Sequence, residues 1–148
     1  MGNAQRMNET QTAWPVVVLD TNIVLDLWLY ADPATPKLRA AIENRQVHWL
    51  ATDEMREELW RVLHYPHIAA RMQLGQQSVD MFMAKFDAFA QMKTAATRAP
   101  YVCKDADDQK FIDLAVTHTA MLLSKDKQVL KLTGRLARLG VKVCTAFQ

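Results

Sequence analysis

The feature that most constrains the fold is a run of four consecutive apolar residues, Val16 to Leu19, three of which are β-branched. Such a run is typical of a strand that is buried on both faces, as in a parallel sheet. Similar short runs recur at 47–51, 121–123 and 141–144, and stretches with helical spacing lie between them. Short apolar strands that alternate with helices predict an α/β fold with right-handed crossovers.

Length and composition exclude several classes of protein. The 148 residues suit one domain, and we expect a mobile, polar lead-in at 1–14 and a single domain at 15–148. Either Met1 or Met7 fits as the natural start. No run approaches the ~20 apolar residues that a bilayer requires, so we expect no membrane segment. The polar N-terminus and only two cysteines indicate a reduced, cytoplasmic protein. The net charge of +2 by itself names no partner.

Caps, prolines and apolar spacing predict six helices, at 22–30, 36–44, 53–64, 77–93, 107–119 and 126–139. The first should stop before Asp32-Pro33, because proline disfavours helix at the residue that precedes it. Thr52 is placed to cap the third helix. The last helix should break near Gly134.

Two acids follow predicted strands directly. Asp20 ends the first strand, and Asp126 follows the strand at 121–123. Ligands of open α/β sheets bind at the carboxyl ends of the strands, so both acids are candidate site residues. Taken alone, each is more easily explained as a helix cap.

Two further acids lie on helices and face inward. At 100° per residue, Glu58 falls on the edge of the buried arc of its helix and Asp108 falls inside the apolar arc of its own, whereas Asp113 points away. Asp107 also faces inward, but its place at the helix start favours a capping role. A carboxylate that faces a core is costly unless it is paired or binds a metal.

Four carboxylates in one cleft repel one another unless a cation neutralises them. Oxygen ligands without a Cys or His cluster favour Mg²⁺ or Mn²⁺, as one or two ions. Such a site is suited to hydrolysis of phosphodiester bonds. The alternative is that arginines, namely Arg56, Arg61 or Arg98, pair with some of these acids.

The ordered set of motifs resembles the PIN-domain ribonucleases, and in particular the VapC-like toxins of bacterial toxin–antitoxin systems. The resemblance spans roughly 16–144 and depends on four motifs: Asp20-Thr21-Asn22, Glu58-Leu59, Asp108-x-x-Phe111-Ile112 and Ser124-x-Asp126. It implies a PIN-like three-layer sandwich, with a central parallel sheet of four to five strands flanked by helices. It also implies an antitoxin partner and a homodimer.

The resemblance further implies cleavage of RNA with Mg²⁺ or Mn²⁺. The catalytic and metal-binding acids would be Asp20, Glu58, Asp108 and Asp126, and Asn22 and Ser124 would be supporting polar residues. Asp105 and Asp107 compete with Asp108 for the third acid position. The Ser124-Lys125-Asp126 segment departs from the Thr-Gly-Asp that is common in the family, although serine keeps the hydroxyl.

Basic residues dominate the C-terminal segment, which has five of them from Lys127 onward and no acid. Candidate contacts to RNA are Lys125, Lys127, Lys131, Arg135 and Arg138. An ordinary solvated helix face explains them equally well. A catalytically silent PIN-like module that binds RNA or docks on a protein is the alternative function. Receiver domains and haloacid-dehalogenase phosphatases fit poorly, because Asp20 lacks the second acid that either class requires.

Overall fold

A computed structural model describes residues 14–30 and 35–147 of the chain. The predicted lead-in up to residue 13, with its two candidate start residues, lies outside the described residues. So does the predicted helix stop at Asp32-Pro33.

The fold is built on a five-stranded parallel sheet with the strand order β3-β2-β1-β4-β5. The strands are β1 (Val16–Leu19), β2 (His48–Ala51), β3 (Gln91–Met92), β4 (Met121–Leu123) and β5 (Val143–Cys144). The predicted strands are confirmed, although β5 begins two residues later than expected. Strand β3 was not predicted, because its residues were assigned to the end of a helix. Ala90 ends that helix in an extended conformation, and the chain then pairs with β2.

The helices match most of the predicted ranges. They are α2 (Thr21–Trp28), α3 (Pro36–Glu43), α4 (Asp53–Leu63), α5 (Pro66–Leu74), α6 (Val79–Phe89), the 3₁₀ turn η1 (Ala106–Asp108), α7 (Gln109–His118), α8 (Lys127–Leu130) and α9 (Thr133–Ala137). The Thr52 hydroxyl caps α4 by accepting from the Met55 N–H, as predicted. Helix α5 was not predicted; Pro66 starts it in the first turn, where proline is tolerated.

The predicted break in the last helix occurs before Gly134. Helix α8 ends at Leu130, the Leu132 N–H bonds to the carbonyl of Val129, and Gly134 lies within α9. A hydrogen bond between residues three apart tightens the turn, and Leu132 is buried in the core. Lys127 and Arg135 therefore lie on two separate short helices, with Lys131 and Arg138 at their C-caps, and the basic residues do not share one continuous helical face.

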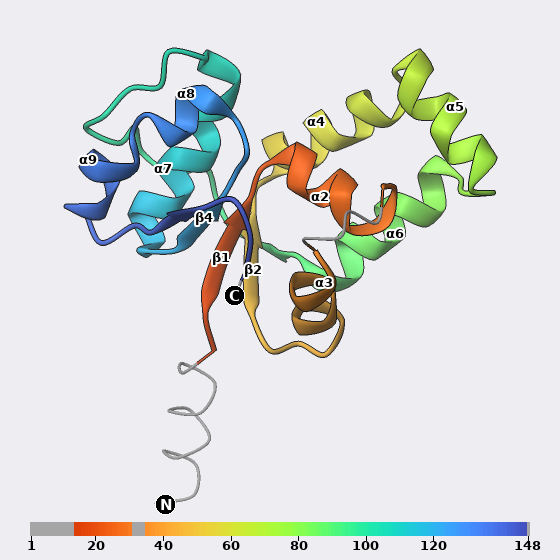
Figure 1. Cartoon of the computed structure of the whole chain (residues 1–148), viewed down its shortest axis with the longest axis horizontal. Coiled ribbons are helices and arrows are strands. Elements are labelled where there is room, and N and C mark those ends of the chain that lie inside the picture. The colour runs from red at the N-terminus through yellow and green to blue at the C-terminus, as the bar shows by residue number, and fades with distance from the viewer. Residues whose placement is uncertain (1–13, 31–34, 148) are drawn as a thin grey trace, which may run out of the picture.

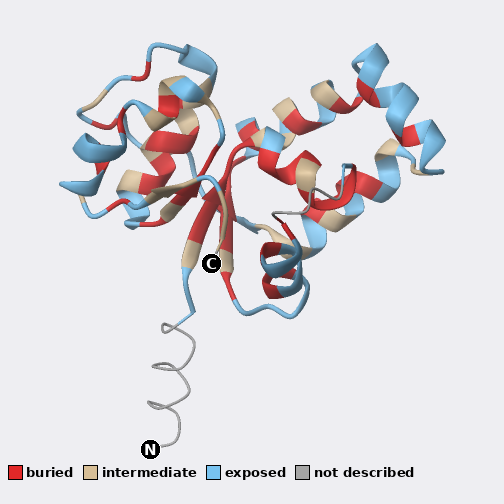
Figure 2. Cartoon of the chain, in the orientation of Figure 1, coloured by how far each residue is buried: buried red, intermediate tan, exposed pale blue. Residues whose placement is uncertain are grey.

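The helices cover both faces of the sheet. Figure 1 shows α7, α8 and α9 on one side of the strands and α2 to α6 on the other. Most residues of β1, β2 and β4 and the helix faces turned toward them are buried, whereas β3 is exposed, β5 is half-buried and the outer helix faces are exposed (Figure 2). The predicted three-layer α/β sandwich is confirmed. Within the described ranges, every helix is too short or too polar to cross a bilayer.

The strand order places a topological switch point at β1. The chain runs from β1 to β2 and β3 on one side and returns to pair β4 with the other side of β1. The Asp20 N–H extends this pairing by bonding to the carbonyl of Leu123 at 3.1 Å. In open α/β sheets the crevice at such a point is where ligands bind. The residues that follow β1 and β4 are therefore brought together at the favoured site.

Candidate active site and metal centre

A pocket of about 260 Å³ lies where β1 and β4 end, between α4, η1 and the start of α8. Six of its lining residues are acids: Asp20, Glu58, Asp105, Asp107, Asp108 and Asp126. They include the four site acids predicted from the sequence, Asp20, Glu58, Asp108 and Asp126. Asn22 also lines the pocket and is exposed. Acids from four separate parts of the chain thus meet in one cavity.

Asp20 is buried and is held by two hydrogen bonds. Its Oδ1 accepts from the Ile23 N–H at 2.9 Å, and its Oδ2 accepts from the hydroxyl of Ser124. The Ser124 oxygen in turn accepts from the Asp126 N–H at 3.1 Å. Asp20 is therefore both a cap of α2 and a pocket acid, because each role uses a different oxygen. Ser124 ties the ends of β1 and β4 together.

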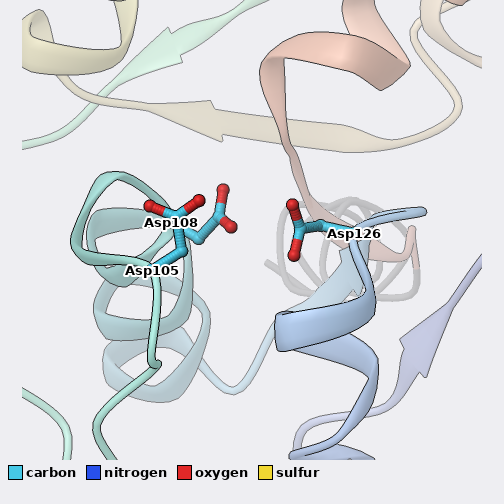
Figure 3. A group of neighbouring side chains, drawn as sticks. All are labelled: Asp105, Asp108 and Asp126. Carbon is cyan, nitrogen blue, oxygen red and sulfur yellow. The ribbon is translucent and has the colours of Figure 1, made fainter.

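Asp105, Asp108 and Asp126 form a cluster of acids that could hold a metal ion. Each offers one carboxylate oxygen, and these three oxygens lie within 4.8 Å of one another. Figure 3 shows Asp105 and Asp108, from the η1 turn, facing Asp126 at the start of α8. Asp126 caps α8 through the Gln128 N–H at 2.8 Å and has its second oxygen left for the pocket.

Three acids compete for the third acid position of the predicted site, and the structure places two of them in the cluster. Asp105 and Asp108 both join the cluster, whereas Asp107 lines the pocket without belonging to it. The predicted capping role of Asp107 is wrong, because Asp105 caps η1 by accepting from the Asp107 N–H at 3.0 Å.

The cluster has the properties of a site for a hard cation. Oδ2 of Asp108 is buried and has no hydrogen-bond partner among the described residues. Burial, followed by the charges of Asp126, Asp105 and Asp20, raises the pKa of the Asp108 carboxyl to about 7. Burial likewise raises the pKa of Asp20 to about 6, although its two hydrogen bonds oppose the shift. A divalent cation removes this repulsion and satisfies the orphan oxygen, so the residues fit Mg²⁺ or Mn²⁺.

Glu58 lies on the opposite wall of the pocket and already has partners. Its Oε1 accepts from Nζ of Lys110 at 2.8 Å, and its Oε2 accepts from the hydroxyl of Thr21. The side chains of Glu58 and Lys110 are only 17% and 12% exposed, so this ion pair is shielded from water. Lys110 was not singled out in the sequence. The sequence feature that could have identified Lys110 is its position in the first turn of α7, where the helix dipole disfavours positive charge.

Pairing of the four acids with arginines was the alternative to a metal. Arg56 binds Asp87 on α6 instead, through two hydrogen bonds of 2.8 Å. Arg61 lines the pocket and is exposed, and no ion pair involves it within the described ranges. None of the four ion pairs found in residues 14–30 and 35–147 includes a member of the Asp105, Asp108 and Asp126 cluster. These contacts favour the cation.

A buried amide holds the segment that carries Asp105. The Gln109 side chain accepts from the Cys103 N–H at 2.6 Å and donates to the Tyr101 carbonyl at 3.2 Å and to Asp113 at 2.8 Å. Asp113, which the helical direction turned away from the apolar arc, accepts from the Ala99 N–H at 2.8 Å and does not line the pocket. Gln109 and Asp113 thus clamp the loop before η1 onto α7.

The basic residues predicted to contact RNA have unlike surroundings. Lys125 is paired with Asp26 on α2 at 2.6 Å. The Arg135 guanidinium lies 5.9 Å from the centre of the Tyr101 ring. All five predicted residues are exposed: Lys125, Lys127, Lys131, Arg135 and Arg138.

Comparison with protein families agrees with this geometry. The family model for the PIN domain matches residues 16–128, which is most of the chain. The protein belongs to the PIN-domain family. PIN domains are generally nucleases, and commonly metal-dependent ribonucleases. A comparison with curated proteins found no match. The matched segment contains all the acids of the pocket, from Asp20 to Asp126.

Proposed function

We propose that this PIN domain is a Mg²⁺- or Mn²⁺-dependent endoribonuclease that hydrolyses phosphodiester bonds of RNA in the cytoplasm. The observation that carries the proposal is the convergence of Asp105, Asp108 and Asp126 around a buried oxygen of Asp108 that has no partner in the described structure. A silent module that only binds RNA or docks on a protein has no need of such a costly cluster. The cluster therefore favours catalysis over that alternative.

The proposed metal ligands are Asp105, Asp108 and Asp126, with Asp20 beside them in the pocket. When bound there, a divalent cation lowers the pKa of its water and stabilises negative charge on the reacting phosphate. Ser124 and the Ile23 N–H fix the orientation of the Asp20 carboxylate. Since these bonds are preorganised, Asp20 need not reorient when substrate enters.

Glu58 is proposed as the residue that orients the attacking water. Lys110 and Thr21 hold its carboxylate at the pocket wall. Arg61 lines the same pocket and is exposed, so its guanidinium is available to a substrate phosphate. Acids that hold a cation and a nearby free arginine together suit a polyanionic substrate.

Cleavage of a fluorogenic single-stranded RNA tests the activity. We expect turnover by the wild-type protein with Mn²⁺ or Mg²⁺, none with EDTA, and a loss of at least about 100-fold in Asp20→Asn. Asp80→Asn is the matched control, since Asp80 is an exposed acid in the first turn of α6 and does not line the pocket. Equal cleavage by wild type and Asp20→Asn would indicate a contaminating nuclease and contradict the proposal.

We further propose that the protein is the toxin of a toxin–antitoxin pair and acts as a homodimer that its antitoxin inhibits. The family resemblance supports this role. Induced expression in bacteria should arrest growth for the wild type and not for Asp20→Asn at equal protein levels. A neighbouring gene for a small DNA-binding protein with a helical tail should restore growth when it is co-expressed. Normal growth of the wild-type strain would contradict the toxin role without affecting the nuclease proposal.

A further inference from the structure

Lys110 is a cation enclosed in the acidic pocket region, and three contacts hold it. Its Nζ donates to Oε1 of Glu58 at 2.8 Å and to the carbonyl of Asp107 at 2.5 Å. The same ammonium lies 4.9 Å from the centre of the Phe111 ring. Only 12% of the side chain is exposed. Lys110 is therefore far more constrained than an ordinary surface lysine.

The position of Lys110 on its helix makes this arrangement costly without Glu58. It is the second residue of α7, where the partial positive charge at the helix N-terminus repels an ammonium. The Glu58 carboxylate offsets that repulsion. The pair also uses Oε1 of Glu58, and the hydroxyl of Thr21 uses Oε2. Both oxygens of Glu58 thus have partners before any metal binds.

The acids of the pocket consequently fall into two groups. Glu58 is neutralised by a cation of the chain itself. Asp105, Asp108 and Asp126 lack an ion-pair partner among the described residues, and Oδ2 of Asp108 also lacks a hydrogen bond there. A second divalent ion in a two-metal site lies about 3.5–4 Å from the first, and Glu58 is the carboxylate of the pocket on α4 that it would use. Near Glu58 it would meet the Lys110 ammonium and a carboxylate whose two oxygens each already accept a hydrogen bond.

We propose that Lys110 serves as a built-in counterion of Glu58, in the place of a second metal, so that the pocket binds one divalent cation. Lys110 is a positioning residue in this role, because it acts through Glu58 and not on the substrate. The inference rests on the proposed function only in assuming that the Asp105, Asp108 and Asp126 cluster binds Mn²⁺. Beyond the proposed function, the inference states how many ions the pocket binds and names Lys110 as the residue that determines this number.

Calorimetric titration of the metal-free protein with Mn²⁺, followed by electron paramagnetic resonance of the bound ion, tests the proposal. Wild type should bind one Mn²⁺ and give the spectrum of an isolated ion. Lys110→Met should bind two and give a spin-coupled spectrum, because ions about 4 Å apart interact magnetically. Lys110→Arg keeps the cation and should bind one. Lys37→Met, which removes an exposed lysine on α3 outside the pocket lining, is the matched control and should also bind one.

A second variant identifies the ligand of the added ion. Lys110→Met/Glu58→Gln removes the freed carboxylate and should return the count to one. This double variant also leaves no unpaired charge, so it serves if Lys110→Met alone unfolds. The Mn²⁺ affinity of this double variant should lie within about threefold of wild type, because neither residue is a ligand of the first ion.

The outcomes separate the two proposals. Two ions in the wild type, or one ion in a folded Lys110→Met, would overturn the role of Lys110 and leave the nuclease proposal intact. A loss of Mn²⁺ binding of 10-fold or more in Lys110→Met/Glu58→Gln would also overturn it, since Glu58 would then be a ligand of the first ion. No Mn²⁺ binding by the wild type would instead contradict the metal dependence on which the proposed function depends.

Discussion

On the wall of the pocket formed by α2 and α4, the Glu58 carboxylate accepts bonds from Lys110 and Thr21. On the wall formed by η1 and α8, Asp105, Asp108 and Asp126 crowd together, and Oδ2 of Asp108 is buried without a partner in the described structure. The first wall is stable as it stands. The second wall is not, because burial, and then the charges of its neighbours, raise the pKa of the Asp108 carboxyl to about 7.

The difference shows how one kind of side chain serves two purposes. A carboxylate that is paired within the protein has a fixed position and no further demand for a cation. Carboxylates left unpaired store repulsion that a bound cation relieves, and the relief contributes to binding affinity. The same distinction between paired and unpaired charges predicts which substitutions abolish function and which only weaken it.

The largest effect should come from breaking the unpaired cluster at Asp108. Asp108→Asn should reduce both Mn²⁺ affinity and RNA cleavage by at least about 100-fold, because it removes the central ligand. Asp107→Asn is the closest control, since Asp107 lines the pocket outside the cluster and should lose less than about threefold. Calorimetry and a fluorogenic RNA measure the two quantities. Similar losses in both variants would mean that the cluster does not define the site.

The next largest effect concerns stability in the absence of metal. The folded-state pKa of Asp20 is about 6 against an ordinary 3.8, so the folded state binds more protons than the unfolded state between these values. The free energy of unfolding should therefore fall as pH rises from about 4 to 7. The raised pKa of Asp108 acts in the same direction.

Asp20→Asn should remove the part of this penalty that comes from Asp20. With EDTA at pH 8, we expect the variant to be more stable than wild type by about 3 kcal/mol, and at pH 4 the difference should fall below about 1 kcal/mol. Urea unfolding at the two pH values measures it. A variant that is less stable than wild type at pH 8 would show that the hydrogen bonds of Asp20 outweigh its buried charge.

The two walls also differ in how far the sequence reveals them. Asp20 and Asp126 follow apolar strands directly, so the strand pattern alone brings them to one edge of the sheet. Asp108 could be found from its helical direction. Asp105 lies in the loop before the 3₁₀ turn η1. Helical periodicity does not predict the direction of a side chain in an irregular loop, so the sequence does not indicate that Asp105 faces the pocket.

Lys110 and Gln109 were missed for a related reason. Their roles depend on partners far along the chain or on loop backbone: Lys110 reaches Glu58, which is 52 residues earlier, and Gln109 binds the backbone of Tyr101 and Cys103. Sequence patterns within one helix or strand do not indicate contacts with distant parts of the chain. The α/β layers, by contrast, follow from burial and alternation that every strand and helix displays in its own residues.

A third, smaller effect should come from weakening the hydrogen bonds that hold the loop before η1, which carries Asp105. Gln109→Met keeps the length of the side chain but leaves the Cys103 N–H without its acceptor, which should cost about 1–2 kcal/mol of stability. Because Asp105 is then less well positioned, Mn²⁺ affinity should fall by up to about 10-fold. Gln73→Met on the exposed face of α5 is the control and should change neither. Unaltered Mn²⁺ affinity in a destabilised Gln109→Met would show that the loop positions nothing in the site.

The smallest effect applies the same comparison to the basic residues outside the pocket. Lys125 is paired with Asp26, whereas Lys131 is exposed and takes part in no ion pair found in the described ranges. If Lys131 contacts RNA, Lys131→Gln should weaken binding only a few-fold and reduce the slope of log Kd against log salt by about 0.7. Lys125→Gln should change the slope less, because its charge is partly compensated by Asp26. Fluorescence anisotropy of a labelled single-stranded RNA, with EDTA present to prevent cleavage, gives both slopes. An unchanged slope in Lys131→Gln would show that RNA does not contact Lys131, and Arg61, which lines the acidic pocket, would then be the favoured phosphate contact. A larger change of slope in Lys125→Gln than in Lys131→Gln would mean that RNA displaces Asp26 from Lys125.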